Sequence, residues 1–339
     1  MTAPDRSRLT VAIPTFNGGE YLEFALRGIL EQSQVRFDML ICDDRSEDDT
    51  IAIARRIAGD RARIVVNENR LGLGANWNRC VELCETPLIA LFHQDDVMLP
   101  GHLAAHLDRF SDDENQTLGM VASASIVIDD RGESVPERIS PPGRLGENNQ
   151  TFPRGEFRRA LVAATPVRCS ATTIRKSVYD QIGGYNVNLK YVIDWEYWIR
   201  LGSAFEVAWL AAPTVSIRRH QASESSRLAR GISDLDEIEA LYQNFKQSAP
   251  DDWKKDLERA RNNLARAYYQ RVHELIKLGR YDLAKLCLKR SLGRSFAAWR
   301  ELARDPRSAV EVAALYAAPG LLKRRAVDRS AARLESRRS

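Results

Sequence analysis

Apolar residues in the first third of the chain occur in short runs that are separated by stretches with helical periodicity. The mostly apolar runs at residues 9–13, 37–42 and 63–66 predict strands. Between the first two runs, Leu22 and Ile29 share one face of a predicted helix. A strand, a tight turn and a helix in this order form the first half of a βαβ unit, which predicts an α/β fold.

Pairs of adjacent carboxylates follow two of the predicted strands. Residues 87–92 form a continuous apolar run, as in a parallel strand covered on both faces, and Asp95-Asp96 follow two residues later. The strand at residues 37–42 is followed by Asp43-Asp44. Ligands of open α/β sheets gather at the carboxyl ends of strands, and adjacent carboxylates require a cation or donors. The pattern predicts a site for a divalent metal and a phosphate-bearing ligand. The alternative is that these residues only cap helices in surface loops.

Glycine-rich phosphate motifs do not account for this site. The sequence has neither a G-x-G-x-x-G after a strand nor a G-x-x-x-x-G-K-[ST]. The first strand is followed instead by residues 14–19 (PTFNGG), a turn whose backbone N–H groups are able to approach a nucleotide. A metal held by Asp95-Asp96 therefore fits the task of neutralising the phosphates.

Strand signals stop after about residue 230, and the apolar positions become helical. We therefore expect a first domain at residues 1–228, a helical region at 229–320 and a basic, flexible tail at 321–339. The tail carries seven Lys or Arg residues against two acids. It suits either an anionic membrane surface or a solvated end. The apolar helix faces predict packing on the first domain or on a second copy, which would make a homodimer.

Composition narrows the class of protein. The chain of 339 residues is 44% hydrophobic and 28% charged, and its net charge is only +4, too small to indicate nucleic-acid binding. Five scattered cysteines favour a reducing compartment over a disulfide framework. The first residues lack the apolar stretch of a signal peptide, and no run is long enough to span a membrane. We expect a cytoplasmic protein, with peripheral contact at the cytoplasmic membrane face through the tail.

Taken in order, these pieces resemble the inverting family 2 glycosyltransferases of the GT-A fold, in the subset that builds bacterial surface polysaccharides. The matching residues are 11–17 (VAIPTFN), 26–32, 41–46 (ICDDRS) with Asp48 and Thr50, then Asn69, Gly72 and Asn76, and finally 94–100 (QDDVMLP). The resemblance covers roughly residues 8–225. It implies a mostly parallel sheet with helices on both faces, followed by a helical C-terminal region.

The resemblance also implies roles for individual residues. The nucleotide of the donor would be bound by Pro14, Thr15, Asn17, Asp43, Asp44, Asn76 and Asp95. Asp96 would hold a divalent metal, Mn²⁺ or Mg²⁺, and His220 would complete its ligands. Arg218 and Arg219 would neutralise the leaving diphosphate or form a lid over it. Asp194, near the start of a predicted helix, would be the general base. His93 departs from the pattern, because the family often has another Asp there.

The implied reaction is transfer of a sugar from a nucleotide-diphosphate donor to a saccharide or a lipid-linked saccharide, with inversion at the anomeric carbon. Two other classes stay open at this point. A nucleotidyltransferase would need a glycine-rich loop with Arg or Lys after the first strand, and residues 15–19 contain no basic residue. A non-catalytic protein that binds a nucleotide sugar or a partner has no need for Asp43, Asp95, Asp96 and Asp194 together.

Overall fold

The computed structural model describes residues 7–135, 145–228, 230–295, 299–300, 303 and 306–317. The chain forms two compact units, Met1–Gln221 and Ala222–Ser339. The domain boundary expected at residue 228 stays a prediction. The basic tail at 321–339 lies outside the described residues, so its contact with a membrane also stays a prediction.

The first unit is built on a nine-stranded mixed sheet in the order β3-β2-β1-β4-β8-β6-β9-β5, with β7 paired to β9. Strands β1 to β4 pair in parallel, as do β6 and β9, whereas β8, β5 and β7 run antiparallel to their neighbours. The bounds are β1 Leu9–Thr15, β2 Asp38–Asp43, β3 Ala62–Val66, β4 Leu88–Leu91, β5 Val97–Met98, β6 Leu118–Ile128, β7 Gln150–Phe152, β8 Thr172–Arg175 and β9 Glu206–Arg218.

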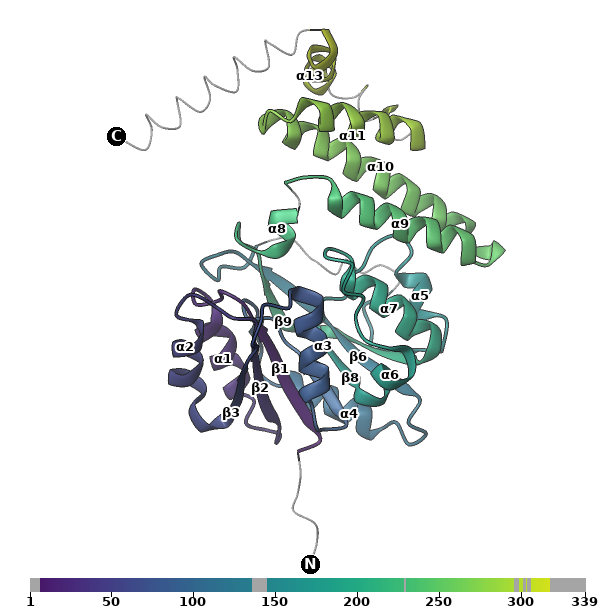
Figure 1. Ribbon diagram of the computed structural model, residues 1–339. Helices are drawn as coiled ribbons and strands as arrows, with labels where there is room; N and C mark the ends of the chain where they lie inside the picture. The colour runs from purple at the N-terminus through teal and green to yellow at the C-terminus, as the bar shows by residue number, and fades with distance from the viewer. Residues whose placement is uncertain are drawn as a thin grey trace, which may run out of the picture. The chain divides into compact units, whose positions relative to one another are not determined.

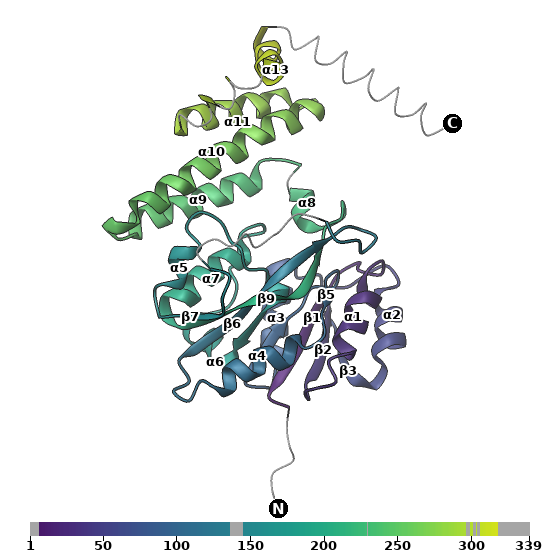
Figure 2. The ribbon, with the colours of Figure 1, turned by 180° about the vertical axis from the view of Figure 1, so that it is seen from behind.

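Helices cover both faces of this sheet (Figures 1 and 2). They are α1 Leu22–Leu30, α2 Thr50–Ala58, α3 Leu73–Leu83, α4 His102–Ser111, α5 Phe157–Ala160, α6 Lys176–Ile182 and α7 Ile193–Ala204, with the 3₁₀ turns η1 Gly59–Arg61 and η2 Cys169–Ala171. Side chains alternate along a strand, so Val11 and Ile13 of β1 pack with Leu26 of α1 and Leu103 of α4 in one buried core. The predicted α/β fold with helices on both faces is confirmed.

The second unit is helical. It comprises α8 Glu224–Leu228, α9 Ser233–Ser248, η3 Asp251–Trp253, α10 Lys254–Lys277, α11 Tyr281–Arg294 and α13 Pro306–Ala317. Its core is formed by residues of α9, α10 and α11, such as Leu235, Val272 and Leu288. A buried ion pair between Arg271 and Asp234, with an Nη2–Oδ2 distance of 2.6 Å, joins α10 to α9. The predicted helical C-terminal region is thus confirmed. Among the described helices, none has the length and apolar character that crossing a membrane requires.

Candidate functional site

The end of β2 and the turn after β1 form the first part of the site. Asp43 is fully buried and accepts hydrogen bonds at 2.8 Å from Thr15 Oγ1 and from the backbone N of Ser46. Asn17 is exposed, and its φ of 46° lies in the left-handed region. Its side chain accepts from the backbone N of Glu47 at 2.9 Å. Pro14 is buried beside Thr15 at the end of β1. Four of the predicted nucleotide residues therefore lie where β1 and β2 end.

Two other predicted nucleotide residues serve the fold directly. Asp44 is buried and accepts from the backbone N of Leu71 at 2.7 Å and of Gly72 at 2.8 Å. Asn76 donates from Nδ2 to the carbonyl of Cys42 at 3.0 Å. The backbone donors of the β3–α3 loop thus compensate the Asp44 charge without a ligand. Asp44 and Asn76 shape the loop beside the site.

Gln94 joins the turn after β1 to the loop after β4. Its Oε1 accepts from the backbone N of Phe16 at 2.9 Å, and its Nε2 donates to the carbonyl of Phe16 at 3.1 Å. Gly18 leaves room for this amide, because a Cβ there would lie 2.1 Å from Gln94 Oε1. The Gln94 side chain therefore holds the loop with the predicted metal residues to the backbone of the turn with the predicted nucleotide residues.

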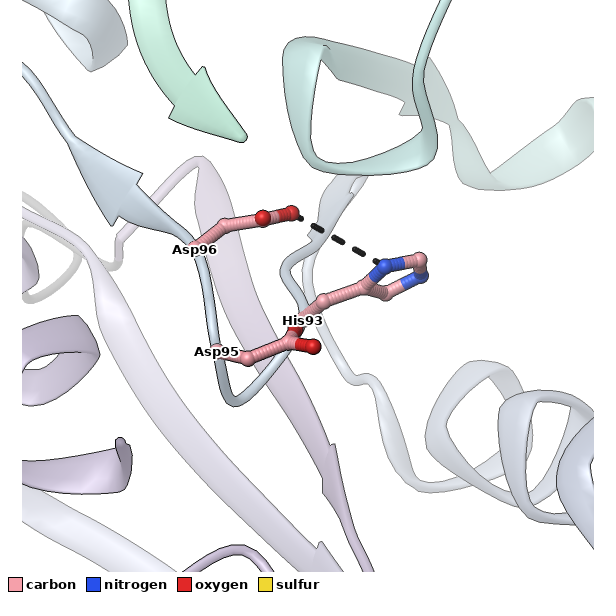
Figure 3. A group of neighbouring side chains, drawn as sticks. All are labelled: His93, Asp95 and Asp96. Carbon is pink, nitrogen blue, oxygen red and sulfur yellow. Dashed lines mark ion pairs between the residues drawn. The ribbon is translucent and has the colours of Figure 1, made fainter. Parts of the chain in front are cut away.

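Three side chains of the loop after β4 converge on one point. One ligand atom each of His93, Asp95 and Asp96 lies within 4.8 Å of the others. Figure 3 shows His93 and Asp96 pointing toward each other, with 3.8 Å between Nδ1 and Oδ2. Two carboxylates and an imidazole at this spacing are able to hold a divalent cation. His93, the residue that departs from the family pattern, therefore belongs to the group.

The two carboxylates of this group differ in their electrostatics. Burial, followed by the neighbouring charge of Asp95, raises the pKa of Asp96 to about 8. Burial also acts to raise the pKa of Asp95, but the hydrogen bond from His220 and the charges of His93 and His220 outweigh it and lower that pKa. Bringing a cation to the group would favour ionised Asp96, since an opposite charge nearby stabilises a carboxylate.

Asp96 is held from two distant parts of the sheet. It is 3% exposed, Ser170 Oγ donates to its Oδ2 at 2.5 Å, and the backbone N of Arg218 donates to its Oδ1 at 3.0 Å. The hydroxyl of Ser170 also accepts from the backbone N of His93 at 3.0 Å. These contacts fix the direction of the Asp96 carboxylate.

The closing segment after β9 meets the same loop. The Arg218 guanidinium donates from Nε to the carbonyl of Asp95 at 3.0 Å and from Nη1 to that of Asp129 at 3.1 Å. The Arg218 guanidinium therefore joins the backbone at Asp95 to the backbone at Asp129, whereas Arg219 is exposed. His220 lies with Nε2 2.9 Å from Asp95 Oδ2. His220 therefore contacts Asp95, whereas the three ligand atoms that converge in the described structure belong to His93, Asp95 and Asp96.

Asp194 lies in the first turn of α7, and its charge acts on His93 of the converging group. Its Oδ1 accepts from the backbone N of Trp195 at 2.7 Å. Burial raises the pKa of Asp194, although the charges of Arg168 and His93 act in the opposite direction. A carboxylate whose pKa is raised is a better base than an exposed one. Glu196, two residues on, instead pairs with Arg200 at 2.7 Å between Oε1 and Nε.

Sequence reasoning missed three contributors to the site: His93, Arg168 and Ser170. His93 carried a local signal, because it lies in the same short segment as the acidic pair. Arg168 and Ser170 lie just before β8, and the pairing of β8 with β4 brings them beside the acidic loop. No local pattern in the sequence reports that pairing.

Comparisons with known proteins indicate the family of the chain. The family described as Glycosyl transferase family 2 matches residues 10–183. An uncharacterized protein of Mycobacterium tuberculosis is 31% identical over 231 residues, which are 66% of this chain and 71% of the relative. The chondroitin synthase of Escherichia coli is 23% identical over 57% of this chain, and the match spans 26% of that longer protein.

Two solved structures share the fold. A structure of Staphylococcus aureus TarS with UDP-GlcNAc matches with a TM-score of 0.53 and 14% identity, over 88% of this chain and 91% of that one. A mannosyltransferase of Pyrobaculum calidifontis with GDP-Man and Mn²⁺ matches with a TM-score of 0.52 and 17% identity, over 96% and 85% of the two chains. The GT-A-like fold that we expected is confirmed, and the chain belongs to glycosyltransferase family 2.

Proposed function

We propose that this glycosyltransferase moves a sugar from a nucleotide-diphosphate donor to a saccharide or lipid-linked saccharide, with inversion and with a divalent metal. One observation carries the proposal. The group of His93, Asp95 and Asp96 shares one electrostatic site with Asp194, because the charges of Asp95 and Asp194 both act on His93. We therefore expect the diphosphate and the base for the acceptor hydroxyl to lie next to each other.

The nucleotide is proposed to bind at the end of β1 and β2. Asp43 and Thr15 form a buried hydrogen-bonded pair there, and the backbone N of Asn17 donates to Ser46 Oγ at 2.9 Å. Carboxylates at strand ends are suited to accept hydrogen bonds from a base or a ribose.

The complexes of TarS with UDP-GlcNAc and of the mannosyltransferase with GDP-Man support a nucleotide-sugar donor.

The residues present fit a divalent cation. Asp96 is buried next to a second carboxylate and its pKa is raised to about 8, so a bound cation would offset the cost of ionising it. His93, Asp95 and Asp96 would hold the cation, Mn²⁺ or Mg²⁺, and we expect His220 to join them or to orient Asp95. When bound, the metal supplies positive charge that stabilises the diphosphate leaving group. Mn²⁺ in the mannosyltransferase complex supports this part of the proposal.

Asp194 is proposed to be the general base. It takes the proton of the acceptor hydroxyl while that oxygen forms a bond to the anomeric carbon and the bond from this carbon to the diphosphate oxygen breaks. The electron pair of the broken bond leaves on the diphosphate. A single displacement inverts the anomeric centre and needs no covalent enzyme intermediate. The raised pKa of Asp194 suits this task, because a more basic carboxylate accepts the proton more readily.

Thermal unfolding against a panel of nucleoside diphosphates, with and without Mn²⁺, tests the donor site. A ligand at 100 times its Kd adds about 2.7 kcal/mol of stability if it binds only the folded protein. We expect a shift that needs both one nucleotide and the metal, and that is lost in Asp96→Ala. NMR of the product then assigns the anomeric configuration. Stabilisation by none of the pairs would contradict the proposal and favour the alternative of a non-catalytic protein that binds a partner.

A further inference from the structure

Arg168 is a cation of the site to which the proposed function gives no task. It lies directly before η2, and its side chain is partly buried. Its Nε is fully buried and has no hydrogen-bond partner. Within the described part of the chain, no hydrogen bond or ion pair within 4.0 Å engages its guanidinium. Arg218, another arginine near the site, differs from Arg168 because its guanidinium donates to backbone carbonyls.

A guanidinium whose buried Nε has no acceptor is unfavourable. It carries a fixed positive charge and five N–H donors in a planar fork. Burial lowers the pKa of Arg168, which reports the same penalty on its charge. Arg175, one strand away, shows the usual solution, because its Nη2 pairs with Asp113 Oδ2 at 2.9 Å. Arg168 thus retains donors that an oxygen anion would satisfy.

The position of Arg168 indicates where that anion lies. Ser170, two residues later, donates to Asp96 at 2.5 Å, so the segment is anchored beside the acidic loop. The charges of Asp194 and Asp96 both act on the Arg168 guanidinium, while Arg219 opposes it. Arg168 therefore lies among the proposed base, the proposed metal group and a second cation. Neither carboxylate is within ion-pair distance of Arg168 in the described structure, so neither forms an ion pair with its guanidinium.

We infer that Arg168 binds an anionic oxygen group at the reacting end of the donor, between Asp194 and Asp96. The inference rests on the proposed function, which places the donor there. Two groups of a donor have this chemistry: the β-phosphate, which every nucleotide sugar carries, and the carboxylate of an acidic sugar. Both accept two parallel N–H bonds from a guanidinium. Bound to the β-phosphate, Arg168 would stabilise the charge that develops when the bond to the anomeric carbon breaks.

Calorimetric titration of the full chain with Mn²⁺ present tests the inference. The probes are a nucleoside monophosphate, the diphosphate, the nucleotide hexose and the nucleotide hexuronate, each with the base that the thermal panel selects. The variants are Arg168→Gln and Arg168→Lys, with Arg61→Gln in η1 as the control for a charge lost at an exposed position outside the site. Unchanged thermal unfolding of the free variants shows that they fold.

A loss of about tenfold or more for the diphosphate in Arg168→Gln, with the monophosphate unchanged, assigns Arg168 to the β-phosphate. The same loss confined to the hexuronate assigns it to a sugar carboxylate. In either case Arg168→Lys restores only part of the affinity, because a lysine lacks the fork. Arg61→Gln has a smaller effect, because the charge of that exposed residue is screened.

Equal affinities of wild type and Arg168→Gln for all four probes would overturn the inference. An equal loss of affinity for the monophosphate would also overturn it, because a nucleoside monophosphate carries the α-phosphate and no β-phosphate. Full rescue by lysine would reduce the role of Arg168 to general charge and would also overturn it. A wild-type chain that binds no nucleotide contradicts the proposed function instead, so the two failures are distinguishable.

Discussion

Ser170 and Asp96, 74 positions apart in the sequence, are joined by a 2.5 Å hydrogen bond from Oγ to Oδ2. The same hydroxyl accepts from the backbone N of His93, so one serine orients two members of the converging group. Partners of this kind fix the geometry of metal ligands, and their loss typically lowers metal affinity 10- to 100-fold.

We therefore expect Ser170→Ala to weaken Mn²⁺ binding by about 10- to 100-fold while the fold is retained. Titration of the free chain with Mn²⁺, followed by electron paramagnetic resonance, measures this without any activity assay. Ser125→Ala is the matched control, because Ser125 is also a buried serine of this unit but its hydroxyl has no hydrogen-bond partner. Equal Mn²⁺ affinity in wild type and Ser170→Ala would show that Asp96 does not bind the metal in this orientation.

Asp194→Asn removes a base and changes the shape of the side chain little. We expect sugar transfer to fall by about 10²- to 10⁴-fold, the range of general-base catalysis, with donor affinity unchanged. Glu196→Gln serves as the control, since Glu196 pairs with Arg200 and leaves the proposed base intact. Transfer near the wild-type rate in Asp194→Asn would remove Asp194 from the mechanism.

The same base predicts the pH dependence of transfer. Burial raises the pKa of Asp194, so it becomes protonated at a higher pH than an exposed Asp would. The transfer rate should therefore decline as the pH falls through this raised pKa, because only the ionised carboxylate accepts a proton. The decline is measured as the acidic limb of kcat. Its persistence in Asp194→Asn would assign it to another group.

The acidic pairs were predictable from the sequence because each lies at or shortly after the end of its own strand. Asp43 and Asp96 needed only a local pattern and the rule that ligands gather at strand ends. The contribution of Ser170 was not predictable, since it depends on β8 entering the sheet antiparallel between β4 and β6. Likewise, the family resemblance implied a diphosphate role for Arg218, which stays a prediction, but it gave no sign that the Arg218 guanidinium donates to backbone carbonyls. Residue type predicted the chemistry, whereas long-range pairing decided which atoms are available.

Gly18→Ala tests whether the two site loops are joined through Gln94. A methyl group there would lie 2.1 Å from Gln94 Oε1. The amide is at the flexible end of a side chain, so we expect it to move and to lose its two hydrogen bonds with Phe16. The loss should lower the free energy of unfolding by about 1–3 kcal/mol and weaken nucleotide binding.

Urea unfolding and calorimetric titration with the selected nucleoside diphosphate measure the two effects of Gly18→Ala. The control is Gly293→Ala in α11, where a Cβ meets nothing within 4 Å. A helical alanine there should be neutral or stabilising by up to about 1 kcal/mol. Unchanged stability and nucleotide affinity in Gly18→Ala would mean that the Gln94 contact does not hold the loops.

Two buried histidines of α4 make the first unit sensitive to acid. His102 and His106 are fully buried, with ring centroids 4.1 Å apart. The Nδ1 atom of His102 lies 2.7 Å from Thr214 Oγ1, and that of His106 lies 2.9 Å from Thr173 Oγ1. Burial lowers the pKa of His102 to about 3 and that of His106 well below its ordinary value. Both rings therefore stay neutral in the folded state at a pH where they are protonated in the unfolded chain.

The sign of the pH dependence follows from this difference. The stability that the neutral pair provides is complete above about pH 6.5, the ordinary pKa of histidine, and is lost as the pH falls, because the unfolded chain takes up two protons that the folded chain excludes. Below about pH 6, the free energy of unfolding should fall in the wild type, relative to His102→Gln/His106→Gln, by up to about 2.7 kcal/mol per pH unit. Asp96, whose pKa is raised, acts in the opposite direction but equally in both proteins, so it cancels in the comparison. Urea unfolding of the two proteins between pH 7.5 and 5 measures the difference, and parallel curves over that range would show that the rings are protonated in the folded state.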